Sequence, residues 1–528
     1  MRKITYLILA LITLIALSLF FRQYFSAKTP VQEIFSEKQD ENKEGTSVSN
    51  YLSGTVAQKK GDIETAIKLF EKALIQDPSN AEIVKRLYGL YLFLGNYDKA
   101  IEMAVRQTAI DNERKIKTAD LDPIAYLLVA LQKLKDNKTN EIPLLLEKIS
   151  DPMLESKSHV DGVVIPMLLS WSYVINADYT SAFRVIDNIT SEYMLSVFSY
   201  NRALINDIAN NKAVKFEDKN LSTPDLAQKM MGEIFFELGQ FSIQNSNLDE
   251  AVVYLRLARY IDRESNKLKG MLALTFEAMG KNKDALNSYY EISQTSENYG
   301  DVLLKIALIQ SRMGNNEKAI ETLEKLKGLE GYKYKAIFGV GSVRLSEDKY
   351  HEAIKYFEEA KAEIKQPKPE NWNLYFSLGV AYDKTGDWVK AESNLKESIK
   401  LFPQNPESLN YLAYSWLVKG KNIDQARGML ETAVIKSGGA PHILDSYGWA
   451  LFKLGNYKEA IPFLEQAANG MPSSAVIIDH LGDAYWKAGR KREAKFQWQK
   501  ALDAYDLDKD INNEISREDL KKKVENGI

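Results

Sequence analysis

The sequence predicts an all-α fold, an α-solenoid of helix-turn-helix repeats preceded by an N-terminal transmembrane helix. The first observation is a series of alanines at intervals of 34 to 38 residues: Ala251, Ala285, Ala319, Ala353, Ala391, Ala426, Ala460 and Ala494. The second is that Ala66 and Ala100 show the same 34-residue step. A fixed period of this length indicates an array of repeats in which each unit packs on its neighbours. The third observation is a long apolar run at the N-terminus.

This apolar run covers residues 4–21, which are 18 uncharged residues after Arg2 and Lys3. As a helix it is about 27 Å long, enough to cross a bilayer core. We interpret residues 1–27 as an uncleaved anchor, with a cleaved secretory signal as the alternative, because the apolar core is longer than in most signals. The basic residues before the run favour an array outside the cytoplasm. We expect a single-pass protein of a bacterial inner membrane facing the periplasm, or a secreted periplasmic form after cleavage.

Three further segments follow the anchor. Residues 28–46 are mostly polar and charged, which predicts a disordered linker. The solenoid covers residues 47–505, with degenerate repeats at about 113–225, where Ala182 lies 82 residues after Ala100 and 69 before Ala251. Residues 506–528 are interpreted as a charged C-terminal tail.

The composition argues against several classes of function. The chain has 69 basic and 72 acidic residues, so no excess of positive charge favours nucleic acid. It contains no cysteine, and its four histidines lie in different repeats without a recognisable catalytic motif. We therefore expect no catalytic residue, no metal site and no cofactor.

One repeat, residues 441–474, shows the unit in detail. Two apolar stripes at helical spacing are separated by a turn at Gly455. Gly448 and Ala460 are small, which allows the two helices to approach closely. The pattern resembles the tetratricopeptide repeat (TPR), and the residues that carry this resemblance are Gly448, Tyr457, Ala460, Phe463, Ala467 and Pro472. The resemblance implies a scaffold that binds proteins.

In the TPR pattern, four positions of each first helix face a concave groove. Carried onto the units from residue 372 to 508, these positions give the candidate protein-binding residues Phe376, Asp383, Lys384, Tyr411, Lys419, Asp445, Trp449, Lys453, Asp479, Asp483, Trp486 and Lys487. Aromatic residues flanked by charges suit a peptide groove. The acids at these positions disfavour a terminal carboxylate, so we expect an internal or mixed-charge segment as ligand. The alternative is that the lysines pair with neighbouring acids and the tryptophans pack between helices.

A narrower resemblance covers residues 400–505. The segments LNYLAY at 409–414, DSYGW at 445–449 and DHLGD at 479–483 resemble envelope TPR proteins of Gram-negative bacteria. One group of these is similar to the lipoprotein adaptor of a carboxyl-terminal processing protease, although this chain lacks the lipid-modified cysteine. The resemblance implies a scaffold that gathers a protease and its substrates rather than a catalyst, and we expect envelope proteins as partners, for example a protease or a cell-wall enzyme. The alternative is a structural subunit of an envelope assembly or secretion complex that uses its convex face.

Overall fold

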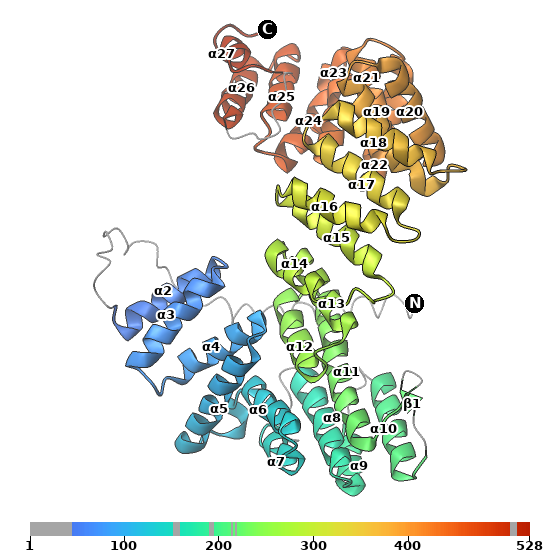
Figure 1. Cartoon of the computed structure of the whole chain (residues 1–528). Helices are drawn as coiled ribbons and strands as arrows, with labels where there is room; N and C mark the ends of the chain where they lie inside the picture. Colours follow the sequence, from blue (N-terminus) through green and yellow to red (C-terminus); the bar gives the residue numbers. More distant parts are fainter. Residues whose placement is uncertain (1–44, 151–158, 190–194, 213–214, 217–218, 507–514) are drawn as a thin grey trace, which may run out of the picture. The chain divides into compact units, whose positions relative to one another are not determined.

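A computed structural model describes residues 45–150, 159–189, 195–212, 215–216, 219–506 and 515–528 (Figure 1). The chain divides into two compact units, residues 1–296 and 297–528. The predicted anchor, residues 1–27, and nearly all of the predicted linker lie outside the described residues. Within the described ranges, no helix is both long and apolar enough to cross a membrane.

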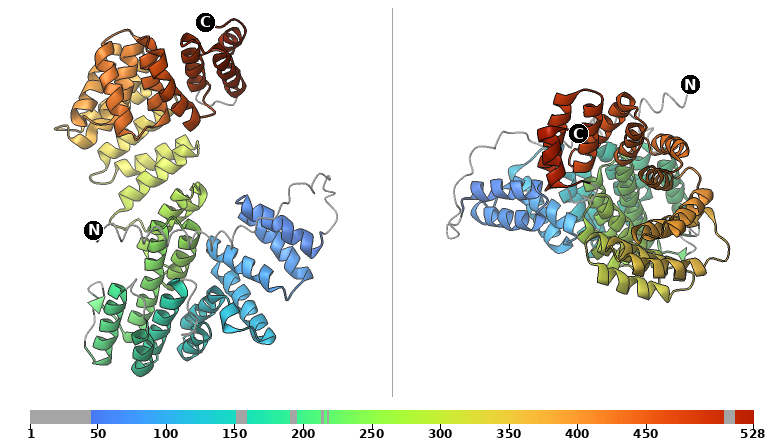
Figure 2. Two further views of the ribbon diagram at one scale, coloured as in Figure 1. Left: turned by 180° about the vertical axis from the view of Figure 1, so that it is seen from behind. Right: turned by 90° about the horizontal axis from the view of Figure 1, so that it is seen from above.

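Unit 1 is built from helices that pack mainly as consecutive pairs. They are α2 (Ser47–Lys59), α3 (Ile63–Gln76), α4 (Ala81–Leu94), α5 (Tyr97–Arg114), α6 (Pro123–Lys135), α7 (Ile142–Glu147), α8 (His159–Ile175), α9 (Tyr179–Asp187), α10 (Leu195–Ala209), α11 (Thr223–Gln244), α12 (Leu248–Ile261), α13 (Asn266–Ala278) and α14 (Asn282–Tyr290), with 3-10 turns at Thr118–Asp120 and Thr139–Glu141. The pairs are seen from two further sides in Figure 2.

The degenerate region of unit 1 departs from simple stacking. Helix α11 packs against α8, so α9 and α10 do not occupy the place of an intervening repeat. A short antiparallel hairpin follows α10, formed by β1 (Lys215–Phe216) and β2 (Lys219–Asn220). The long interval between Ala182 and Ala251 therefore contains α10 and this hairpin rather than another regular helix pair.

Unit 2 is a regular array of six helix pairs followed by one further helix. The helices are α15 (Tyr299–Arg312), α16 (Asn316–Lys327), α17 (Lys333–Ser346), α18 (Tyr350–Ala362), α19 (Trp372–Lys384), α20 (Trp388–Leu401), α21 (Pro406–Val418), α22 (Ile423–Lys436), α23 (Pro441–Lys453), α24 (Tyr457–Gly470), α25 (Ala475–Lys487), α26 (Lys491–Tyr505) and α27 (Arg517–Asn526), with a 3-10 turn at Pro369–Asn371. The predicted all-α solenoid is confirmed; the hairpin in unit 1 is the exception among the described residues.

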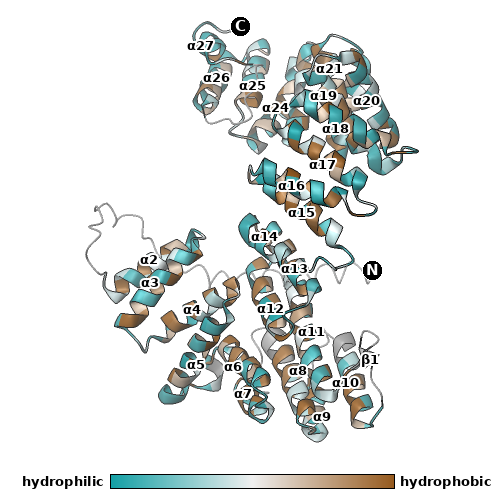
Figure 3. Ribbon diagram, viewed as in Figure 1, coloured by the Kyte–Doolittle hydropathy of each residue, from teal (hydrophilic) through white to brown (hydrophobic). Residues whose placement is uncertain are grey.

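The period of the sequence arises from packing between the two helices of each pair. Every alanine of the series is fully buried. A Cβ atom added to Gly448 on α23 would lie 2.6 Å from Cγ of Leu464 and 3.4 Å from the carbonyl oxygen of Ala460, both on α24. Figure 3 shows apolar and polar residues alternating along the helices, as expected when one face of each is buried. The predicted close approach at Gly448 and Ala460 is confirmed.

Candidate protein-binding site

The candidate residues lie on the first helices of the last four pairs of unit 2 (Figure 1). They are Phe376, Asp383 and Lys384 on α19, Tyr411 and Lys419 at α21, Asp445, Trp449 and Lys453 on α23, and Asp479, Asp483, Trp486 and Lys487 on α25. Three of the four lysines end their helices, and Lys419 directly follows α21. Cations are favoured there because the helix macrodipole is negative at the C-terminus. The recurrence of lysine at this position therefore has a local cause besides ligand binding.

Contacts between α19 and α21 join aromatic and charged candidates. The ring of Tyr411 meets the ring of Phe376 edge-on, with centroids 5.9 Å apart. The hydroxyl of Tyr411 donates to Oδ2 of Asp383 at 3.2 Å, and Nζ of Lys419 lies 3.3 Å from Oδ1 of the same carboxylate. Burial and the charge of Asp383 raise the pKa of Tyr411, which keeps its hydroxyl protonated as a donor. Phe376, Asp383 and Tyr411 remain partly exposed.

Next to this group, Val418 is an aliphatic side chain left in solvent. It lies at the end of α21 and is 62% exposed. Together with Phe376, Asp383, Tyr411 and Lys419 it forms what we call the α19–α21 surface. This surface combines apolar area with an acid and a base, the composition expected for a peptide-binding groove.

On α23, Trp449 is stacked by residues of the chain itself. Its ring lies 4.6 Å from the ring of Phe452 at an interplanar angle of 5°, and 3.9 Å from the ring of His480 at 13°. Nζ of Lys453 lies 4.7 Å from its ring centroid. The arrangement favours the alternative in which Trp449 packs between helices.

The buried acid Asp445 pairs with a histidine of the next repeat. Nδ1 of His480 lies 3.0 Å and 3.1 Å from the two carboxylate oxygens of Asp445. Burial opposes the charge on His480, but the carboxylate of Asp445, aided by Asp479 and Asp483, prevails and raises the pKa of His480. When it is protonated, the imidazole balances a buried carboxylate between α23 and α25.

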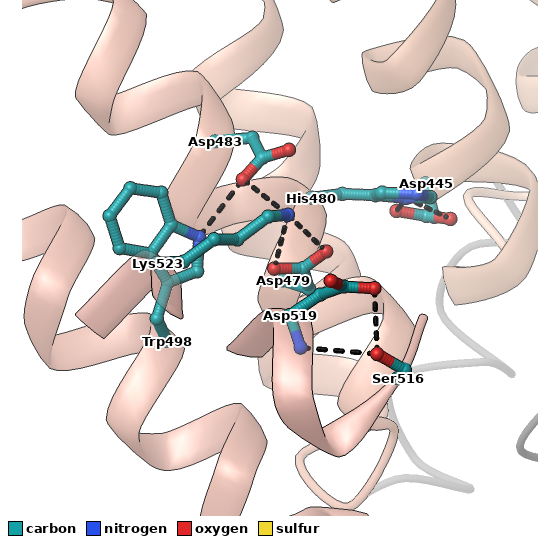
Figure 4. Close-up of polar contacts among 8 residues, drawn as sticks. All are labelled: Asp445, Asp479, His480, Asp483, Trp498, Ser516, Asp519 and Lys523. Carbon is teal, nitrogen blue, oxygen red and sulfur yellow. Dashed lines mark hydrogen bonds and ion pairs between the residues drawn. The ribbon is translucent and has the colours of Figure 1, made fainter. Parts of the chain in front are cut away.

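One repeat further, a lysine of α27 takes the corresponding place (Figure 4). Nζ of Lys523 lies 2.8 Å and 2.7 Å from the carboxylate oxygens of Asp479, and 2.8 Å from Oδ1 of Asp483. Nε1 of Trp498 donates to the same oxygen of Asp483 at 2.9 Å. Both acids are buried, so this pairing offsets the cost of two carboxylates in a poorly solvated site.

The electrostatics of this cluster follow from burial and from its two neighbouring acids. Burial is the main cause that raises the pKa of Asp479, and the negative charge of Asp483 is the second. Burial opposes the charge on Lys523, but the two carboxylates prevail and raise its pKa. Lys523 therefore stays protonated, and its positive charge offsets the free-energy cost of burying the two carboxylates.

Helix α27 thus covers three of the candidate residues of α25, namely Asp479, Asp483 and Trp486. Besides the Lys523 contacts, Gly527 lies against Trp486, where a Cβ atom would be 2.0 Å from the indole ring. Trp486 also packs against Trp498 at 5.3 Å between centroids. The sequence interpretation of residues 506–528 as a charged tail missed this helix, because only the buried Leu520 and the partly buried Val524 mark its apolar side among many charged residues.

Sequence reasoning also missed the roles of His480 and Lys523. The four histidines lie in different repeats without a metal or catalytic spacing, so the motif search assigns His480 no role. A signal was available in the repeat register, since Asp445 and His480 are 35 residues apart and therefore face each other on consecutive first helices. The same register pairs Glu407 with His442 and Asp301 with Lys335. Lys523 has no such signal, because the segment before α27 breaks the period.

These features define an α-solenoid of paired helices, a class whose repeats present extended surfaces to other proteins. Profiles of the tetratricopeptide repeat family match residues 57–119, 301–329, 338–406 and 417–474. The chain is a TPR repeat protein, and such repeats imply a protein-interaction scaffold, generally without catalytic activity.

Several curated proteins resemble the chain. A TPR repeat-containing protein of Pseudomonas aeruginosa is 27% identical over 35% of this chain and 29% of its own length. Those of Bacillus subtilis and Methanocaldococcus jannaschii are 23% and 20% identical over 53% and 71% of this chain, and over 64% and 61% of their own lengths. The chain thus spans less than two thirds of each of these relatives.

Solved structures show the same kind of fold at low similarity. The chain is similar to the crystal structure of the APC/C hetero-tetramer Cut9-Hcn1, with 14% identity, coverage of 90% and 96% of the two chains and a TM-score of 0.41. It is also similar to yeast Tom70, with 16% identity, coverage of 91% and 95% and a TM-score of 0.36. At these scores the similarity carries no argument about function.

Proposed function

We propose that the chain is a membrane-anchored scaffold of the bacterial envelope that binds segments of other proteins through its C-terminal repeats. The observation that carries the proposal is the α19–α21 surface, where Phe376 and Tyr411 are partly exposed beside a carboxylate and an ammonium group. Partly exposed aromatic side chains bury large area on binding at a small entropic cost. The proposed ligand is an internal segment of mixed charge, because Asp383 and Lys419 offer both signs.

The candidate residues on α23 and α25 are largely in contact with other parts of the chain, which restricts the proposed groove to fewer helices. Asp479, Asp483 and Trp486 already contact α27, and Asp445 and Trp449 contact His480. The proposed binding surface therefore runs along α19 and α21, with Lys384 and Lys453 at its exposed edge.

Site-specific photocrosslinking tests this surface. A benzophenone amino acid replaces Val418, which is 62% exposed at the end of the first helix α21, or Val389, which is 79% exposed on the second helix α20. The two sites are matched in residue type and accessibility. Crosslinks to a discrete partner from position 418, without the same product from position 389, would support the proposed groove.

The proposed anchor and location rest on residues 4–21 and on the resemblance to envelope TPR proteins. Reporters that are active only outside or only inside the cytoplasm, fused after Ile528, test the orientation, and the mass of the mature chain tests cleavage. A C-terminus inside the cytoplasm would contradict the periplasmic placement. An envelope protease or cell-wall enzyme remains the proposed type of partner.

A structural role in a larger envelope assembly is the second candidate. It is favoured by apolar side chains exposed on second helices, namely Val389 on α20, Ile435 on α22 and Phe496 on α26, which are 79%, 71% and 68% exposed. Photocrosslinks from position 389 but not from position 418 would support this role instead of the groove.

A further inference from the structure

We propose that unit 1 contains a binding site for an oxyanion, formed by residues that the proposed function above does not use. The site is an open cavity of about 340 Å³ beside α5, α12 and α13. Its lining residues are Tyr97, Arg259, Arg263, Glu264, Lys269 and Glu291.

Guanidinium groups lie close together at this cavity because α12 packs against α4, a helix that is distant in the sequence. Arg256 and Arg259 are three residues apart on one side of α12, and Arg263 follows the end of this helix at Ile261. Nε of Arg256 donates to the carbonyl oxygen of Phe93 at 3.2 Å, across 163 residues of sequence. The guanidinium group of Arg263 lies 5.7 Å from the ring centroid of Tyr97.

The cations outnumber the carboxylates around the cavity. Arg259 pairs with Glu291, and Nζ of Lys269 lies 3.4 Å from Glu264. The side chain of Lys269 is 8% exposed whereas that of Glu264 is 94% exposed, so the charge of Lys269 is poorly compensated. With Arg263, three cations face two acids along the cavity. Arg263 is exposed, but the buried charge of Lys269 requires compensation, and an anion would supply it.

Helix dipoles do not account for this cluster. The C-terminus of α12 favours Arg259, which lies in its last turn. Lys269, however, lies in the first turn of α13, where the positive end of the dipole disfavours a cation. Its position is therefore better explained by a negative ligand.

Tyr97 offers an unused donor at the same place. Arg256 acts on the hydroxyl as a donor, but within the part of the chain that the structure describes the buried hydroxyl itself donates no hydrogen bond. Burial raises the pKa of Tyr97, while Arg256, Arg259 and Arg263 act in the opposite direction, which is consistent with their closeness to the ring. An oxyanion would accept the missing hydrogen bond and the donors of the guanidinium groups.

Calorimetric titration of the full chain tests the proposal. The probes are inorganic phosphate and succinate, each compared with sodium chloride at the same ionic strength. We expect saturable binding of one equivalent and a ligand-dependent rise in melting temperature. Arg263→Gln should weaken binding about tenfold or more, because it removes charge-assisted hydrogen bonds. Arg427→Gln, the same change at an exposed arginine of α22, should leave binding unchanged.

Tyr97→Phe separates a binding role from a structural one. We expect it to lower the affinity several-fold without lowering the melting temperature of the free protein, because the hydroxyl donates no hydrogen bond there. Binding of phosphate alone would assign a phosphate group as ligand, and binding of both probes would extend the assignment to dicarboxylates. Binding no greater than in sodium chloride, or equal binding by wild type and Arg263→Gln, would overturn the proposal.

Discussion

Replacing Lys523 by methionine should selectively destabilise the last repeat. The substitution keeps the aliphatic stem but removes the charge that balances Asp479 and Asp483. Breaking a buried ion pair costs about 3–5 kcal/mol. Because the Lys523 side chain is 19% exposed while that of Asp479 is 3% exposed, we expect the lower end, about 3 kcal/mol.

The assay is native-state hydrogen exchange of α25 and α26, because repeat arrays open locally and a global melting curve would average over the repeats. A loss of about 3 kcal/mol corresponds to roughly 100-fold faster exchange through local opening. Lys522→Met is the matched control. The ammonium group of Lys522 forms an exposed pair with Glu518 at 3.7 Å, which contributes about 0.3–0.5 kcal/mol.

The pH dependence gives a second readout of the same substitution. Without Lys523, the pKa of Asp479 should rise further above its ordinary value, since burial and Asp483 already raise it. Protonation of the folded protein then relieves the penalty as the pH falls. The effect of Lys523→Met should therefore be smaller at pH 5 than at pH 8. Equal exchange in the Lys523 and Lys522 variants, or an equal effect at both pH values, would refute the reasoning.

Three further outcomes are expected. The pKa of His480 is raised in the folded protein, so the stability that its protonation contributes is present below about pH 6.5 and is lost as the pH rises through this raised pKa. His480→Gln should therefore flatten the decline in melting temperature between pH 6 and 8. An unchanged slope would contradict this. The double substitution Trp449→Ala with Trp486→Ala should lower the free energy of unfolding by roughly 2 kcal/mol per site, about half the value for a fully buried aromatic residue. An unchanged melting temperature would instead support the interpretation that both tryptophans serve only the groove. In thermal unfolding, Gly448→Ala should lower the free energy of unfolding by about 1–3 kcal/mol, because the new methyl group overlaps α24. Gly428→Ala on α22 should be neutral or stabilising, because the space around its Cβ position is open. Similar losses of stability in the two variants would contradict the packing argument.

The sequence predicts the fold well because one packing contact recurs in every repeat. The helix pairs of unit 2 follow from the spacing of buried alanines such as Ala460, and the approach at Gly448 follows from the small side chains. Contacts between distant repeats have no periodic signal. The hydrogen bond from Arg256 to Phe93 and the insertion of α10 could not be read from a 34-residue pattern.

The candidate site was only partly accessible to sequence reasoning. The repeat pattern places the candidate residues on the first helices, as the structure does, but it does not reveal which of them are already in contact with other residues of the chain. Asp445 and Asp479 look like free acids until His480 and Lys523 are placed beside them. The α19–α21 surface keeps exposed area, and its binding role stays a prediction.

The pairing of acid and base across first helices has a consequence for how such an array could lengthen. Duplication of residues 475–508 would place a second histidine one period after Asp479, in the relation that His480 has to Asp445. The duplicated aspartate would then meet Lys523, as Asp479 does now. A gene that gains a copy of this unit would thus encode a longer protein in which both copies of Asp479 are paired, whereas the first copy of Asp483 would keep its hydrogen bond from Trp498 but lose Lys523, so growth by tandem duplication would cost the array one buried ion pair.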